Sequence, residues 1–131
     1  MANSADFKPG FNGSEGSYVP DMLLAGDKDI HTDGVIVASG QTIVRGALLG
    51  IVTATGKAIL SLSGASDGSE VPVCIAGEDV DASGGDTNSW AYFAGEFNEN
   101  QMTFGTGHTA DSVRAGLRDK SIYLHNPIVA E

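Results

Sequence analysis

The sequence predicts a mainly β fold, a small β core with one short helix near the C-terminus. Glycine accounts for 18 of the 131 residues, about twice its average share and without a collagen-like period, which favours many turns and short strands. β-Branched and apolar segments at residues 35–37, 41–44, 58–62 and 71–75 alternate with turn signals at the spacing of an all-β meander. The densest apolar run, residues 43–52, lies within this block and is expected to form the core.

The second half of the core is expected at residues 89–97, SWAYFAGEF, where four aromatic side chains occur at strand spacing. Because side chains alternate along a strand, Trp90 and Tyr92 should project to one side and Phe93 to the other. A final short strand is expected at residues 122–124.

Residues 109–120 carry the signals of a short helix. Thr109 or the preceding histidine can cap its N-terminus, Asp111 lies in the first turn, and basic residues lie near the C-terminal end. Val113 and Leu117 are four residues apart, so they share a face that can pack on the sheet.

Length and charge limit the function. A chain of 131 residues fits one domain, and its one cysteine, Cys74, excludes an internal disulfide. No signal peptide and no membrane-spanning apolar stretch is visible in the sequence. Seventeen acidic residues against seven basic ones give a net charge of −10. Such a surface repels phosphate groups, which argues against nucleic-acid and membrane partners.

The expected domain division is a flexible N-terminal arm at residues 1–20 followed by a single β-rich domain at residues 21–131. The arm is rich in glycine, proline and small polar residues and shows no periodicity, so it cannot bury enough surface to offset its ordering entropy. It nevertheless carries Phe7, Phe11 and Tyr18. Two interpretations stay open: a disordered end, or an arm that becomes ordered on a partner with these aromatics as anchors.

Motifs that look catalytic lack the context that their chemistry needs. Residues 50–58 resemble a phosphate loop but have the wrong glycine spacing and end without the hydroxyl that binds magnesium. Residues 64–68 match a nucleophile elbow but lead into loop and strand, not into a helix. The three histidines are far apart in the sequence, and no Ser-His-Asp or Cys-His set can be assembled. The sequence therefore predicts a protein that is not an enzyme and has no metal or cofactor.

Two other classes of function remain as alternatives. One is a stand-alone recognition module that binds glycans by stacking on Trp90 and Tyr92. The other is a small β enzyme or enzyme subunit that holds a metal ion in the acidic, glycine-rich loop at residues 78–86. The first predicts exposed aromatic rings and a sugar-dependent change in the fluorescence of Trp90, and the second predicts stabilisation of the protein by a metal ion.

Several stretches, taken in order, resemble the head decoration proteins of lambda-type tailed phages. They are RGALLG at residues 45–50, DGSEVPVCIAGEDVDA at 67–82, AGEFN at 94–98 and LRDKSIYL at 117–124. The resemblance extends over roughly residues 21–124, and it depends on the order and spacing of these pieces.

The resemblance implies a structural virion protein with a β-clip-like fold and no catalytic residues. It implies a homotrimer that binds the major capsid protein at threefold and quasi-threefold sites, on the outside of the expanded capsid. There it would stabilise the shell against internal DNA pressure. It further implies that the N-terminal arm is loose in solution and ordered on the shell, which makes Phe7, Phe11 and Tyr18 the expected capsid-binding residues.

Overall fold

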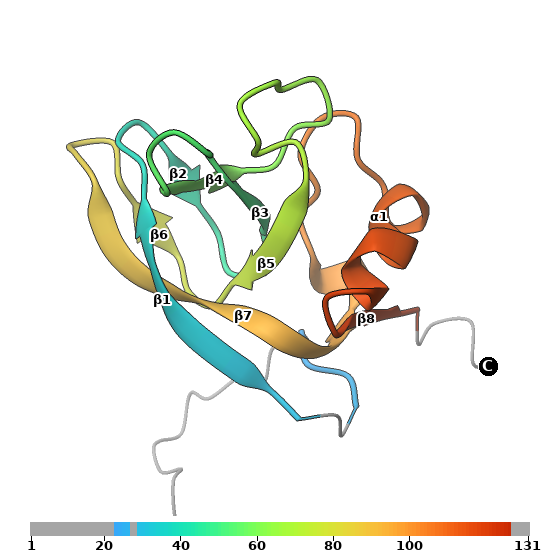
Figure 1. Cartoon of the computed structure of the whole chain (residues 1–131). Helices are drawn as coiled ribbons and strands as arrows, with labels where there is room; N and C mark the ends of the chain where they lie inside the picture. The colour runs from blue at the N-terminus through green and yellow to red at the C-terminus, as the bar shows by residue number, and fades with distance from the viewer. Residues whose placement is uncertain (1–22, 27–28, 127–131) are drawn as a thin grey trace, which may run out of the picture.

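The computed structural model describes residues 23–26 and 29–126. Five strands close into a small barrel, and a sixth, parallel strand extends the sheet beyond the last of them (Figure 1). In spatial order the strands are β1 (His31–Val37), β4 (Ala58–Leu60), β3 (Leu48–Ile51), β5 (Pro72–Ala76), β7 (Thr87–Asn98) and β8 (Ile122–His125).

Smaller elements complete the described fold. A two-stranded ladder joins β2 (Thr42–Ile43) to β6 (Val80–Asp81), and the 3-10 helix η1 (Glu99–Gln101) directly follows β7. The helix α1 (Ala110–Arg118) lies on the outside of the barrel beside β5 and β8 (Figure 1). The predicted mainly β fold with one short helix near the C-terminus is confirmed.

The predicted helix forms where its local signals place it. The Thr109 hydroxyl accepts a hydrogen bond from the Ser112 amide at 3.1 Å, and the Ser112 hydroxyl accepts one from the Thr109 amide at 2.8 Å. This reciprocal pair satisfies amide groups that the first turn leaves without intrahelical partners. Val113 and Leu117 are both buried, as their spacing predicted.

The predicted meander is wrong in its strand order. β5 pairs with β3 and not with its chain neighbour β4, while β1 pairs along its length with the distant strand β7. β1 also begins at His31, although the residues just before Val35 are mostly polar and are typical of a connector. Pairing with β7 overrides that weak local preference, and closure of the barrel protects the strand edges.

Two apolar clusters lie on the two sides of the barrel wall. The inner cluster fills the barrel with mostly small side chains, as a narrow barrel requires, and consists of Val37, Ile43, Ala47, Leu49, Ala58, Cys74, Ala76, Val80, Ala82 and Ala91. The outer cluster lies under α1 and β8 and consists of Leu23, Leu48, Ile75, Tyr92, Phe97, Val113, Leu117, Ile122 and Leu124. Phe93 packs against the inner cluster and Trp90 against the outer one, so the predicted alternation is confirmed.

The turn that follows residue 67 packs against strand β3 at Gly50. A Cβ atom on Gly50 would overlap the carbonyl group of Ser69, which is backbone and therefore cannot rotate away. We expect Gly50→Ala to lower the free energy of unfolding by about 1–3 kcal/mol, since the added methyl group must displace that segment. Denaturant titration measures this change.

The matched control is Gly84→Ala, because nothing lies within 4 Å of a Cβ at that position and its φ is not in the left-handed region. This variant should keep the stability of the parent. Equal stability of the two variants would contradict the close packing of residue 69 on β3.

Candidate functional site

The described chain begins in a backbone ladder at the end of β7. The Leu23 carbonyl accepts a hydrogen bond from the Asn98 amide at 2.6 Å, and the Ala25 amide donates to the Glu96 carbonyl at 3.0 Å. The Leu23 side chain is 1% exposed and belongs to the outer cluster. The residue at which the arm joins the domain is therefore fixed in the core.

The side chain of Glu96 contacts the next part of the chain, at Gly26. The Glu96 side chain lies directly against the backbone of Gly26, where a Cβ would overlap it, and its Oε1 atom is 2.6 Å from Nε2 of His125. Because Glu96 is on β7 and His125 is the last residue of β8, this contact joins the start of the described chain to its end.

Exposed side chains lie around the contact of Glu96 with Gly26 and His125. Leu24 forms an isolated bridge with Phe97, and Ile30 lies beside Gly95, where a Cβ would be 3.5 Å from its Cγ1 atom. Leu24 is 37% exposed and Ile30 is 49% exposed, which is high for large apolar side chains. We call this area the arm-base surface. Figure 1 shows it at the lower end of the barrel; its exposed residues are Leu24, Gly26, Ile30, His31 and His125.

The predicted capsid-binding residues Phe7, Phe11 and Tyr18 lie outside the described residues. All three precede Leu23, so the chain that carries them enters the domain at the arm-base surface. This surface was not predicted from the sequence. Its one signal was a short apolar patch at residues 22–25 inside a polar stretch.

The predicted glycan platform is wrong. Tyr92 is only 6% exposed, and its ring makes edge contacts with Trp90 and Phe97 at centroid distances of 5.2 and 5.3 Å. Its hydroxyl accepts a hydrogen bond from Arg45 Nη1 at 3.0 Å. The Trp90 ring covers Gly77, where a Cβ would overlap it. A sugar ring therefore cannot stack on both aromatics.

The carboxylates of the acidic loop are used separately. Asp79 accepts a hydrogen bond from the Arg45 amide, Asp81 accepts one from the Ser83 amide, and Asp86 pairs with Lys57 at 2.5 Å. Hydrogen bonds from Ser83 lower the pKa of Asp81. In residues 23–26 and 29–126 no three His, Cys, Asp or Glu side chains are grouped to hold a metal ion. The loop carboxylates thus stabilise turns and do not converge.

One serine and one histidine do meet, but not as a nucleophile and base. Ser61 Oγ is 3.0 Å from His108 Nε2, yet it donates its proton to the Ser69 carbonyl at 2.7 Å. The Ser61 hydroxyl therefore accepts a hydrogen bond from the imidazole of His108. Ser61 is also fully buried, unlike a nucleophile that a substrate must reach. The thiol of Cys74 is also fully buried, and burial raises its pKa to about 12, which makes it unreactive. These groups hold the loops and the barrel together.

The described residues therefore define a small closed barrel whose serine, histidine, cysteine and acidic side chains serve the fold, with an exposed apolar surface at one end. The chain belongs to the bacteriophage lambda head decoration protein D family, whose model matches residues 12–122. A comparison with the curated proteins gives no match. None of the helices in the described part of the chain is long and apolar enough to cross a membrane.

Membership in the family carries direct consequences. The family is structural and not enzymatic, and it implies a capsid decoration role with a location on the virion capsid. Binding to the capsid follows from the same membership. The prediction made from the order of four short motifs is thus confirmed by a match over most of the chain.

The buried position of Leu23 can be tested by measuring the stability of variants in solution. We expect Leu23→Ala to lower the free energy of unfolding by about 2–4 kcal/mol, because it leaves a cavity in the outer cluster. Leu24→Ala, one residue along and on the exposed side, should change stability by less than about 0.5 kcal/mol. Urea titration measures both variants, and an equal loss in the two would contradict the core position of Leu23.

Proposed function

We propose that this protein binds as a homotrimer to the outside of an expanded phage capsid and stabilises the shell against internal DNA pressure. Its sites are the threefold and quasi-threefold positions of the major capsid protein. The observation that carries the proposal is the family match over residues 12–122, which includes all five barrel strands and part of the N-terminal segment. The chain would be made in the host cytoplasm and join the virion from there.

The arm-base surface faces the shell in this proposal. The arm enters the domain at Leu23, so an arm that binds the capsid brings this end of the barrel closest to it. Leu24 and Ile30 supply exposed apolar area there. Phe7, Phe11 and Tyr18 act as anchors on the capsid protein, and the arm backbone pairs with an exposed strand edge.

The charge of the protein fits an outer position. With −10 per chain, the domain is repelled by packaged DNA, and a trimer would carry three times that charge.

Each fully buried aromatic side chain of the arm contributes roughly 1.5–3 kcal/mol to binding before the entropy cost of ordering is subtracted. Three arms on one trimer raise the effective concentration of the second and third contacts, which offsets the entropy of ordering.

Deletion of residues 1–20 separates binding from folding. We expect the truncated protein to keep its melting temperature, because its first core residue, Leu23, remains. Binding to expanded shells that lack decoration should fall by at least about 100-fold, since three lost anchors at roughly a factor of ten each are partly offset by the ordering cost that the arm no longer incurs. Co-pelleting with shells measures the affinity. Undiminished binding by the truncated protein would show that the arm is not the capsid-binding segment.

The oligomeric state is tested independently of the shell. Sedimentation equilibrium should give about three times the chain mass of 13.4 kDa. A monomer at every concentration, both free and on shells, would contradict the homotrimer.

A further inference from the structure

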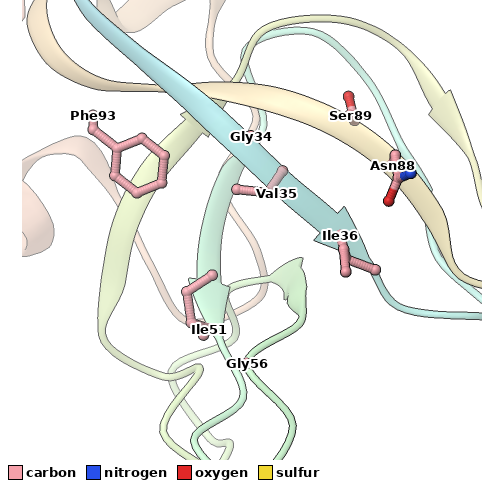
Figure 2. A pocket seen from close by; sticks show the side chains of 8 residues that line it. All are labelled: Gly34, Val35, Ile36, Ile51, Gly56, Asn88, Ser89 and Phe93. Carbon is pink, nitrogen blue, oxygen red and sulfur yellow. The ribbon is translucent and has the colours of Figure 1, made fainter.

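An apolar hollow of about 460 Å³ lies between β1 and β3. The side chains of Val35, Ile51 and Phe93 point toward one another across it (Figure 2). All three are only partly buried and pack against the inner cluster. The hollow is therefore an exposed extension of the barrel core.

The hollow is open because β1 separates from β4. The two strands pair at Val37 and Ala58 alone, with the Ala38 amide donating to the Ala58 carbonyl at 3.0 Å. On this side, no strand of the described chain pairs with residues 32–36. Ile36 adds a 44% exposed side chain at the same edge.

Two carboxylates are hydrogen bonded to residues that line the hollow. Asp33 precedes the lining residue Gly34 and accepts a hydrogen bond from its amide at 2.8 Å. Glu78 accepts one from the lining residue Ser89 at 2.7 Å. Asp86, next but one to the lining residue Asn88, is already paired with Lys57 and adds no net charge there. An apolar floor with an acidic rim fits a long basic side chain, whose stem is apolar and whose end is charged.

This protein presents such side chains at the end of α1. Arg118 and Lys120 are exposed, and neither has an ion-pair partner among the described residues. The third basic residue there, Arg114, is held by Glu99, Asp111 and the Leu124 carbonyl, all at about 3 Å. Two cations are thus available on a chain whose net charge is −10.

We propose that the hollow binds the C-terminal end of α1, Arg118 and Lys120, of a second copy of this chain. The inference rests on the proposed homotrimer and names the two surfaces that meet in it. Copies that each carry −10 repel one another, and a contact that brings opposite charges together reduces this repulsion. The acidic rim and the end of α1 are the described surfaces that do so.

The two surfaces lie on different parts of the molecule. The hollow opens at the gap between β1 and β4, whereas α1 packs outside β5, which lies across the barrel from that gap (Figure 1). One copy can therefore use both at once, and such a head-to-tail contact can close into a ring. In the contact, the stems cover Val35 and Ile51, while the cations reach the rim carboxylates and the face of Phe93.

Cross-linking between copies tests the contact. Asn88→Cys places a thiol at the hollow, and Ala115→Cys places one on the exposed side of α1, one turn before Arg118. Both are made in the full chain, mixed in equal amounts and treated with a flexible bis-maleimide, in solution and on expanded shells. The native Cys74 is buried and should not react. We expect a cross-linked dimer in the mixture and little product from either variant alone.

A matched control separates the loss of these two cations from the change in net charge. Adding Arg118→Gln and Lys120→Gln to the Ala115→Cys chain should reduce the product about fivefold to tenfold, as expected for two lost ion pairs. Adding Ser66→Glu and Gln101→Glu instead changes the net charge equally, at exposed residues that neither line the hollow nor belong to α1, and should leave the product unchanged. Equal loss in both would show that net charge alone controls association and would overturn the proposal.

Other outcomes separate this proposal from the proposed function. A trimer by sedimentation with no cross-link in the mixture would leave the homotrimer standing and overturn the contact. Equal product from one variant alone would indicate that like surfaces meet and would also overturn it. Cross-linked product in chains that stay monomeric or form open polymers by sedimentation would support the contact and contradict the closed trimer.

Discussion

The strand β7 is the constraint on which the rest of the structure depends. Its twelve residues pair with three strands, β1, β5 and, toward its C-terminal end, β8. Its two faces carry the aromatic side chains of both clusters, Phe93 on the inner side and Tyr92 on the outer side. The carbonyl of Leu23, the first described residue, accepts a hydrogen bond from the amide of Asn98, the last residue of β7. Barrel closure, the seat of α1 and the position of the arm base all follow from this strand.

An irregularity in β7 explains why the two clusters are arranged as they are. His31 pairs with Ala94 but Thr32 pairs with Tyr92, so β7 has one extra residue at Phe93. A bulge of this kind reverses the alternation beyond it. Phe97 therefore joins Tyr92 in the outer cluster, although strict alternation would place it with Phe93. The outer cluster then covers Leu23, which couples the fixed arm base to the barrel.

How far the fold could be predicted depends on the range of the interactions. The helix is specified locally by Thr109, Ser112 and the spacing of Val113 and Leu117, and it was predicted with nearly its observed bounds. Strand positions followed from β-branched residues in the same way. The pairing of β1 with β7 joins residues far apart in the sequence, and no local pattern near His31 indicates it. The hollow and the arm-base surface arise from that pairing, so the sequence could not predict them, and the capsid-binding role of Phe7, Phe11 and Tyr18 stays a prediction.

In the proposed arrangement the end of the barrel at Leu23 faces the capsid, and hydrogen exchange tests this orientation. Exchange is compared between the free protein and the protein bound to expanded shells. We expect slower exchange on the shell for backbone amides of residues 23–26, 30–31 and 123–126, with little change in the loop at residues 61–70, at the other end of the barrel (Figure 1). Protection confined to residues 61–70, with unchanged exchange at residues 23–31, would contradict it.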